Sequence, residues 1–278
     1  MVFVEGSTST SPAARTNLTS FKVILNKGRL VGVGAFRYCY FGTFVGGNRN
    51  QQEAVCKCFK SEFRSLEDEF YEHDKHITDK AIDLAEGWNA MCEFGKEILI
   101  TQGNVHELNG VKYIVEPMIR YFTKFTSNSG WIADVDDVGW SVLAMEAFSH
   151  YTYHRSGGQL IVCDLQGRYR NNRYNPKKSR FELTDVAICS RQRRYGPTDL
   201  GEKGIATFFA NHRCNKFCNR NERWHRPKNP GRWFDSVSET SMMASNFSGF
   251  LSIKNRTRWD HPNLPPIQVF TDSDDDSW

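Results

Sequence analysis

The chain has 278 residues, of which 39% are hydrophobic and 13% aromatic, a composition typical of a folded protein rather than a disordered one. Its 36 basic residues are nearly balanced by 32 acidic ones, so the net charge of +4 argues against a general nucleic-acid-binding protein. The sequence shows neither a secretory signal nor the apolar run of about 18 residues that a membrane-spanning helix needs. We therefore expect an intracellular, cytoplasmic protein without a membrane partner, whose eight cysteines stay reduced or bind metal.

The first half of the chain is predicted to form a lobe built mainly from antiparallel strands. Residues 1–19 are rich in Ser and Thr and are expected to be flexible. Clusters of β-branched and aromatic residues predict strands at 21–25, 38–45, 54–59, 97–101 and 111–115. The last two of these strands are separated by an Asn109-Gly110 turn. Between the strands, the charged stretch 61–89 with its spaced apolar residues predicts a half-buried helix or helix pair, so the N-terminal lobe covers about residues 20–116.

The second half is predicted to form another lobe, about residues 117–218, with the hinge near 117–123. Apolar residues recur there at helical spacing, at Val142, Met145, Phe148 and Tyr151. Gly157-Gly158 ends this helix before a buried strand at 160–163. From residue 219 onward the periodicity is lost, so 219–278 is expected to be largely disordered. The elements together predict an α+β fold with mostly antiparallel sheets.

A cluster of metal-binding residue types lies near the end of the second lobe. His212, Cys214 and Cys218 offer one imidazole and two thiolates, which suit a tetrahedral zinc ion. His150, on the predicted helix, is the best candidate for a fourth ligand, because the metal would then fasten one helix to another. A site with four protein ligands leaves no open position for water, so its role would be structural. The alternative is that the cysteines are ordinary core or surface thiols.

Charged and amide side chains lie inside or directly after apolar strand segments. Asp164 and Gln166 follow a predicted strand, and on extended backbone they would face the same way and converge on magnesium or phosphate. Asp185 can supply a second carboxylate. Lys57 lies within an apolar strand, where its charge needs an anionic partner such as a carboxylate or phosphate. The alternatives are turn capping for the aspartates and an exposed edge strand for the lysine.

Two glycine-containing segments are candidates for binding an anion. Gly32 and Gly34 lie in a turn between predicted strands, where backbone amides can approach a phosphate and Arg37 can bind it. Gly201 and Gly204 precede an apolar helix, whose first amides can hold an anion. Neither segment matches a dinucleotide-binding or Walker motif, so a ligand-free hairpin and an ordinary helix-entry loop are the alternatives.

Several of these motifs follow one another in a particular order. They are the Gly-x-Gly-x-x-Arg turn, the strand lysine, Ile114-Val-Glu-Pro117, Phe148-Ser-His-Tyr-Thr-Tyr153, Cys163-Asp-Leu-Gln-Gly167, Leu183-Thr-Asp185, Leu200-Gly-x-x-Gly204 and His-x-Cys-x3-Cys. The ordered set resembles the alpha-kinase family over roughly residues 20–218. The resemblance implies a two-lobed, protein-kinase-like α+β fold with a structural zinc in the C-terminal lobe. It also implies magnesium-dependent transfer of the γ-phosphate of ATP to a serine or threonine of a protein substrate of unknown identity.

The resemblance further implies roles for individual residues. The residues for catalysis and magnesium are Lys57 on the ATP phosphates, Asp164 on the acceptor hydroxyl or transition state, and Gln166 and Asp185 on the metal. Those for the nucleotide are Gly32, Gly34, Arg37, Lys57, Glu116 at the adenine-contacting hinge, Asn128 near nucleotide or substrate, Gly201 and Gly204. Those for zinc are His150, His212, Cys214 and Cys218. Phosphoryl transfer depends mainly on positioning and charge neutralisation, which these residue types can supply.

The chain departs from the family pattern in two places. A basic, aromatic insert at 168–178 precedes Asp185, and Thr198-Asp199 stands where a Gly-Asn pair is expected. An active kinase is the preferred interpretation. A catalytically silent pseudokinase scaffold is the first alternative, which a displaced Asp185 would favour. A zinc-bearing nucleic-acid-binding protein that uses the basic insert is the second.

Overall fold

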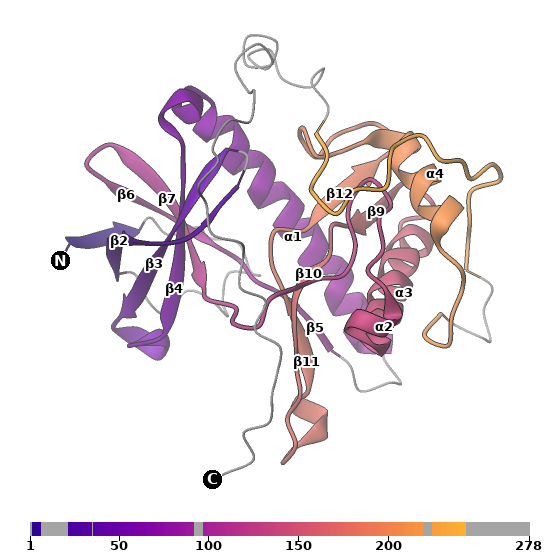
Figure 1. The fold of residues 1–278 in the computed structure, drawn as a ribbon, viewed down its shortest axis with the longest axis horizontal. Helices are drawn as coiled ribbons and strands as arrows, with labels where there is room; N and C mark the ends of the chain where they lie inside the picture. The colour runs from indigo at the N-terminus through magenta and orange to yellow at the C-terminus, as the bar shows by residue number, and fades with distance from the viewer. Residues whose placement is uncertain (1, 7–21, 35, 92–96, 219–223, 243–278) are drawn as a thin grey trace.

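The computed structural model describes residues 2–6, 22–34, 36–91, 97–218 and 224–242, which form two lobes (Figure 1). The N-terminal lobe is a closed antiparallel barrel with strand order β1-β2-β3-β4-β7-β6. Its strands are β1 (Val2–Gly6), β2 (Lys22–Val33), β3 (Arg37–Val45), β4 (Glu53–Phe59), β6 (Asn104–Leu108) and β7 (Val111–Pro117). Short 3-10 helices lie before and after β4, at Gly47–Arg49 and Ser61–Leu66. Inward-facing residues such as Val23, Phe44 and Val115 fill the barrel.

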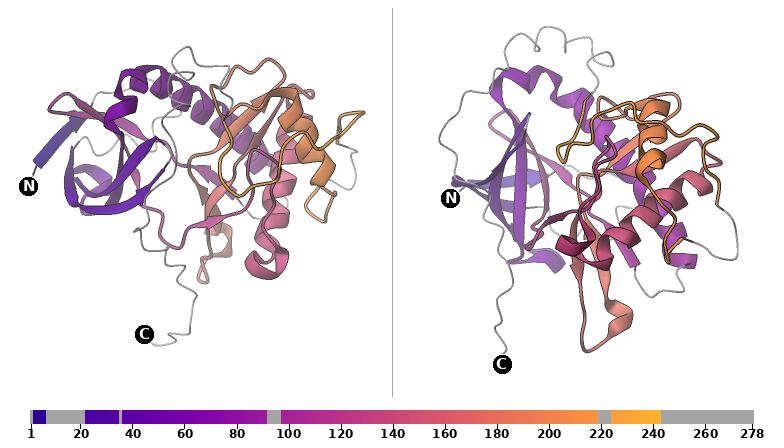
Figure 2. Two further views of the ribbon diagram at one scale, coloured as in Figure 1. Left: turned by 45° about the horizontal axis from the view of Figure 1, so that its top comes forward. Right: turned by 45° about the vertical axis from the view of Figure 1, so that its right-hand side comes forward.

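Helix α1 (Glu67–Met91) connects the barrel to the second lobe (Figure 2). Its apolar residues recur every three or four positions, which confirms a long, half-buried helix in the predicted region. Near its start, Phe70 packs with Phe59 of the barrel. Further along, Leu84 and Trp88 lie in the core of the C-terminal lobe. The helix therefore anchors both lobes through two separate apolar clusters.

The C-terminal lobe combines two small sheets with three helices. One sheet has the order β5-β11-β10-β8, in which β5 runs parallel to β11 and the other pairs are antiparallel, and the second is the antiparallel pair β12-β9. The strands are β5 (Glu97–Ile100), β8 (Thr123–Lys124), β9 (Leu160–Cys163), β10 (Gln166–Arg170), β11 (Arg180–Leu183) and β12 (Ala187–Ser190). The three helices are α2 (Val135–Val138), α3 (Trp140–Arg155) and α4 (Gly201–Asn211), and a 3-10 turn lies at Pro176–Lys178. In the described parts of the chain, no helix combines the length and apolarity that crossing a membrane requires.

The N-terminal lobe differs from its prediction in three ways. Residues 2–6 were expected to be flexible, but they form β1 and close the barrel against β2 and β6. The segment 97–101 was expected in this lobe, but β5 pairs with β11 of the other lobe. The Asn109-Gly110 turn joins β7 to β6, a strand that the sequence did not reveal. For β1 against β6 and for β5 against β11, a partner far along the chain decides the pairing, and local propensity does not report it. Residues 7–21 lie outside the described part.

Residues 224–242 pack against the C-terminal lobe, although a largely disordered tail was predicted from residue 219. Trp224 is buried in the core of the lobe. The backbone amide of Trp233 donates to Thr207 Oγ1 of α4 at 3.0 Å. The segment forms neither helix nor strand, and individual contacts of this kind leave no periodic pattern in the sequence. The remainder of the predicted tail lies outside the described residues.

Candidate active site

Lys57 is the centre of an ion-pair cluster that joins the two lobes. Strand β4 places its ammonium 2.6 and 2.7 Å from the two carboxylate oxygens of Asp185, and 3.0 Å from Glu116 Oε1. The lysine is only 6% exposed, and a charge buried to this extent needs anionic partners. Burial alone would lower the pKa of Lys57, but the two carboxylates outweigh it and raise the pKa above its ordinary value. Lys57 is therefore a permanent cation, as a phosphate-binding group must be.

The two carboxylates around Lys57 have pKa values that are shifted in opposite directions. Burial raises the pKa of Glu116, although Lys57 opposes this shift, and Thr184 Oγ1 donates to the second oxygen of Glu116. Burial would also raise the pKa of Asp185, but its contact with Lys57 prevails and holds that pKa below its usual range. Asp185 has a positive φ of 51°, so it lies in a sharp turn after β11. It is therefore the firmly ionised partner of the lysine.

Asp164 and Gln166 join the cluster from the chain that follows β9. Gln166 Nε2 donates to the backbone oxygen of Asp185 at 3.0 Å and lies 3.4 Å from Asp164 Oδ2. Asp164 forms an ion pair of 2.8 Å with Lys124 of β8. Burial raises the pKa of Asp164, and Lys124 opposes this rise. Asp164 has a positive φ of 57°, so a turn, and not the predicted extended backbone, brings the two side chains together.

The basic insert 168–178 leaves Asp185 in place. The strands at its two ends form an antiparallel hairpin in which Gly167 lies opposite Leu183. Gly167 has a φ of 147°, and a Cβ there would lie 2.0 Å from Glu182 O, so this pairing requires glycine. The residues that form ion pairs with the Glu182 carboxylate are Arg168, Arg170 and Arg180. The insert is thus a closed hairpin that returns the chain to the site, which argues against the displacement that a pseudokinase would show.

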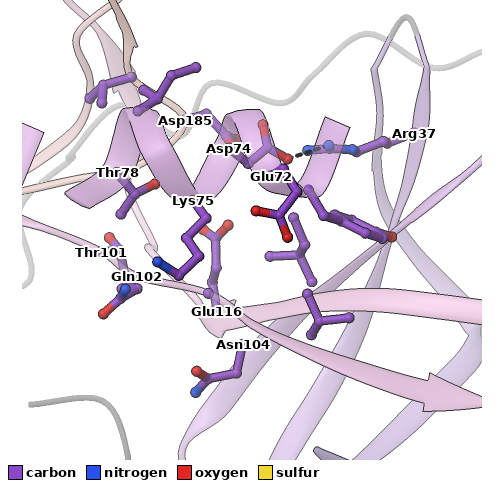
Figure 3. A pocket seen from close by; sticks show the side chains of 16 residues that line it. Arg37, Glu72, Asp74, Lys75, Thr78, Thr101, Gln102, Asn104, Glu116 and Asp185 are labelled. Carbon is purple, nitrogen blue, oxygen red and sulfur yellow. Dashed lines mark hydrogen bonds and ion pairs between the residues drawn. The ribbon is translucent and has the colours of Figure 1, made fainter. Parts of the chain in front are cut away.

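Arg37 lines a cavity beside the Lys57 cluster. The cavity has a volume of about 160 Å³, and its polar lining includes Arg37, Asp74, Gln102, Glu116 and Asp185 (Figure 3). Arg37 forms an ion pair with Asp74 of α1, and its guanidinium carbon lies 4.5 Å from the ring centre of Phe59. The amide of Gly34 donates to the carbonyl of Arg37 at 2.8 Å and closes the turn, whereas Gly32 lies in β2, opposite Cys39 of β3, and not in the turn as predicted. The predicted glycine turn therefore ends at the cavity wall, with its arginine directed toward α1.

The second glycine segment has a packing role. The amide of Gly201 donates to Asp199 Oδ1 at 2.9 Å, so it is not open to an anion as predicted. A Cβ at Gly204 would lie 2.7 Å from Cys189 Sγ, so glycine allows α4 to lie against β12. Neither glycine lines the cavity beside Lys57. The side chain of Asn128 binds backbone groups of the loop before α4 and of the C-terminal segment.

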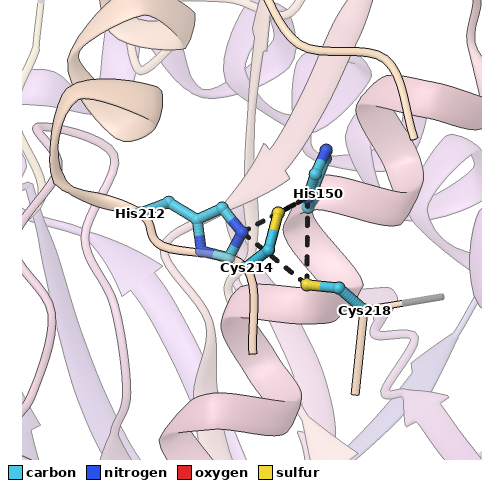
Figure 4. A group of neighbouring side chains, drawn as sticks. All are labelled: His150, His212, Cys214 and Cys218. Atoms are coloured by element: carbon cyan, nitrogen blue, oxygen red, sulfur yellow. Dashed lines mark hydrogen bonds between the residues drawn. The ribbon is translucent and has the colours of Figure 1, made fainter. Parts of the chain in front are cut away.

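Four predicted metal ligands come together in the C-terminal lobe (Figure 4). His150 Nδ1 lies 3.2 Å from His212 Nε2, 3.6 Å from Cys214 Sγ and 3.9 Å from Cys218 Sγ. Zinc–nitrogen bonds of about 2.0 Å and zinc–sulfur bonds of about 2.3 Å place the ligand atoms of a tetrahedron roughly 3.3–3.8 Å apart. The three distances are close to this range and all four atoms lie within 4.8 Å of one another, so the cluster fits a four-ligand zinc site.

The surroundings of this cluster also fit a metal. Glu146 Oε1 lies 2.9 Å from His212 Nδ1, and the backbone oxygen of His225 lies 3.0 Å from His150 Nε2. Metal-binding histidines are usually oriented by such a partner on the nitrogen that faces away from the metal. Burial lowers the pKa of His150 to about 4, which keeps it in the neutral form that a ligand requires. The donor set suits zinc.

Several residues that complete these sites were not predicted from the sequence. They are Asp74, Lys124, Glu146 and Thr240, whose hydroxyl donates to Asp164 Oδ2 at 2.7 Å. Glu146 left a usable signal, because a carboxylate among the apolar residues of α3 needs a buried partner. The other three carry no pattern, since their partners lie far away along the chain.

The chain is similar in sequence to known proteins. The family model described as "Alpha-kinase family" matches residues 32–218. The chain is 33% identical over 143 residues to alpha-protein kinase vwkA of Dictyostelium discoideum, covering 46% of this chain and 21% of that protein. It is also 33% identical over 150 residues to eukaryotic elongation factor 2 kinase of Rattus norvegicus, covering 53% of this chain and 17% of that protein. The chain thus spans about a fifth of the length of these curated relatives.

Solved structures show the same fold. An alpha kinase from Entamoeba histolytica superposes with a TM-score of 0.62 at 21% identity, covering 87% of this chain and 98% of that one. The alpha-kinase domain of myosin heavy chain kinase A, in a complex with AMP, gives a TM-score of 0.58 at 21% identity, covering 78% and 95%. The predicted two-lobed α+β fold is confirmed. Because the family model matches well over half of its length, this chain belongs to the alpha-kinase family.

Proposed function

We propose that this chain is an ATP-dependent protein kinase that transfers the γ-phosphate of ATP to a serine or threonine hydroxyl of a protein. One observation carries the proposal: a buried lysine is held between two carboxylates, and Gln166 connects one of them to Asp164. The cluster places a fixed cation, two oxygen ligands and a carboxylate within reach of one reacting centre. Phosphoryl transfer needs this combination more than it needs covalent chemistry.

Each member of the cluster has a distinct proposed role. Lys57 neutralises phosphate oxygens, and to do so it exchanges part of its contact with Asp185 for the nucleotide. Asp185 and Gln166 then present oxygens to Mg²⁺, which when bound neutralises charge on the transferred phosphate. Glu116 keeps the ammonium in position during this exchange. Asp164 orients the acceptor hydroxyl and accepts its proton.

Glu116 lies at the end of β7, directly before the predicted hinge, and we propose a further role for its side chain. Its side chain points to Lys57 and Thr184, so we assign the carboxylate to positioning Lys57. Strand β7 ends at Pro117, and the segment after it leads into β8 of the second lobe. Adenine contacts at the hinge would then come from the backbone of this segment.

The cluster of His150, His212, Cys214 and Cys218 is proposed to bind a structural zinc ion. The ion would attach α3 to the segment that follows α4, because these two parts of the chain supply all four ligands. No ligand position is left for a water molecule, so the site contributes to folding and not to catalysis.

The test is transfer of labelled phosphate from ATP to a generic basic protein with magnesium. We expect transfer by the wild type and a loss of about 10²- to 10³-fold in Lys57→Ala and Asp185→Ala, because each substitution removes a charge that stabilises the transition state. Lys112→Ala is the matched control, since Lys112 pairs with Asp68 at the surface, away from the site. A folded, zinc-loaded wild type that binds nucleotide but transfers no phosphate would contradict the proposal and favour a pseudokinase scaffold.

A further inference from the structure

The C-terminal segment 235–242 crosses the active site of its own chain. The segment follows α4 and returns over the C-terminal lobe toward the middle of the molecule (Figure 1). Asn211 of α4 donates to Ser236 Oγ at 3.2 Å, and at the far end Met242 packs on the Phe59 cluster of the barrel. The segment therefore touches both lobes and passes between them at Asp164.

Thr240 lies where an acceptor hydroxyl is needed. Its Oγ1 donates to Asp164 Oδ2 at 2.7 Å, the carboxylate oxygen that also lies 3.4 Å from Gln166 Nε2. Lys124 Nζ, which forms an ion pair with Asp164, lies 3.5 Å from the same hydroxyl. The hydroxyl is thus bonded to the carboxylate that the proposed function assigns to orienting the acceptor.

The backbone of the segment is bound on both sides of Thr240. Asn128 Nδ2 donates to Ser241 O at 2.7 Å, and the amide of Ser241 donates to Asn128 Oδ1 at 2.8 Å. Ser129 Oγ donates to Val237 O at 3.2 Å and accepts from the amide of Val237 at 3.3 Å. Within the segment, these two side chains bind main-chain groups, so they would accept an extended peptide of varied sequence.

Asn128 and Ser129 are themselves almost fully buried, at 2% and 0% exposure. Buried amide and hydroxyl groups need hydrogen-bond partners, and without the segment some of theirs would be lost. A bound peptide would replace the same hydrogen bonds. Asn128 and Ser129 are therefore suited to release the segment and bind an extended peptide in its place.

We propose that residues 235–242 occupy the acceptor-peptide groove as an internal substrate mimic, with Thr240 in the acceptor position and Asn128 and Ser129 as the peptide-binding residues. This inference rests on the proposed kinase function. It specifies the substrate as an extended peptide whose backbone is bound at the residue after the acceptor hydroxyl and at the third residue before it. A protein substrate must displace the segment before it can bind.

Thr240 in this position is itself an acceptor. With MgATP bound, the bond from the γ-phosphorus to the bridging oxygen of ADP breaks, and a bond from that phosphorus to Thr240 Oγ1 forms. The hydroxyl proton passes to Asp164. The products are ADP and a phosphothreonine, and no other reactant is needed.

The first experiment measures KM for the basic protein substrate in the full chain. Thr240→Glu removes the donor and places a second negative charge beside Asp164, so the segment should leave the groove. Hydrogen bonds to a charged group contribute about 1.5–3 kcal/mol, so we expect KM for the protein to fall by about tenfold or more, with KM for ATP unchanged. An unchanged KM for the protein would overturn the inference. Ser241→Ala is the matched control, since the backbone of Ser241 makes its bonds to Asn128.

Two further measurements do not depend on substrate kinetics. Hydrogen exchange should show protected amides at Val237 and Ser241 in the wild type and faster exchange in Thr240→Glu; equal exchange in both would contradict the inference. After incubation with MgATP alone, mass spectrometry should find phosphate on Thr240, formed at a rate independent of protein concentration. That phosphate should persist in Ser241→Ala and be lost in Thr240→Val.

The outcomes separate this inference from the kinase function itself. If the wild type phosphorylates the basic protein but Thr240 stays unmodified, the kinase function stands and the mimic is rejected. If the wild type phosphorylates both the basic protein and its own Thr240, and Thr240→Glu has the lower KM for the protein, both are supported. If no variant transfers phosphate, the kinase function fails and the mimic fails with it.

Discussion

The ammonium of Lys57 contacts both carboxylate oxygens of Asp185, although 128 positions separate the two residues in the sequence. One lies on a barrel strand of the N-terminal lobe and the other in a turn of the C-terminal lobe. The relative position of the two lobes therefore decides whether this ion pair can form.

Removing the lysine charge should destabilise the fold as well as lower the activity. In Lys57→Met, Glu116 is left buried without its cation, and breaking a buried pair in this way costs about 3 kcal/mol. The double variant Lys57→Met/Glu116→Gln should recover about 1 kcal/mol of the free energy of unfolding, because the uncompensated charge is gone. Urea unfolding of the single and double variants measures this difference. If the double variant were less stable than the single one by the full cost of Glu116→Gln alone, the two groups would not be coupled.

Activity should fall on the acid side at a higher pH than an ordinary aspartate would give. Burial raises the pKa of Asp164 above its usual value of about 3.9, and the proposed mechanism needs its ionised form. The ionised form predominates above the raised pKa, so kcat/KM should be full at higher pH and decline as the pH falls through that pKa. Lys124→Met removes the cation that opposes the rise and should move the acid limb to higher pH. An acid limb that does not move in this variant would assign it to another group.

Zinc affinity should depend on Glu146 as well as on the four ligands. Glu146→Gln keeps the shape of the side chain but removes the charge that faces His212 Nδ1, so we expect zinc affinity to fall by about 10- to 100-fold. Competition with a metal chelator measures this affinity, and metal analysis should find about one zinc per wild-type chain. Cys214→Ser should lose the metal, whereas Cys39→Ser, a half-buried cysteine of β3, should retain it. Equal zinc content in both cysteine variants would refute the site.

Gly167→Ala should weaken the hairpin that positions Asp185. The new Cβ would lie 2.0 Å from Glu182 O, at a φ of 147° that alanine rarely adopts, so β10 must move away from β11. We expect a loss of about 2 kcal/mol or more in the free energy of unfolding, together with lower kcat. Gly28→Ala is the control, since its Cβ would lie 3.4 Å from the nearest atom and meet no backbone. Thermal unfolding and the kinase assay together check both expectations.

The chemistry of the site was more predictable from the sequence than its geometry. A lysine in an apolar strand predicted an anionic partner, and the structure confirms two, at Asp185 and Glu116. The expectation for Gly201 was wrong, because the nearby Asp199 already accepts its amide. The strand at residues 2–6 and the packed segment 224–242 were missed, since each is held by partners distant in sequence.

The amino-acid sequence by itself determined the family, the two-lobed architecture and the residue types that can hold phosphate, magnesium and zinc, because these depend on local pattern and on side-chain chemistry. Only the tertiary structure decided which groups meet. It placed Glu116 on Lys57, Glu146 on His212 and Thr240 on Asp164. Contacts of this kind depend on the folded path of the chain, since a hydrogen bond forms over about 3 Å and its partners can be any distance apart in sequence.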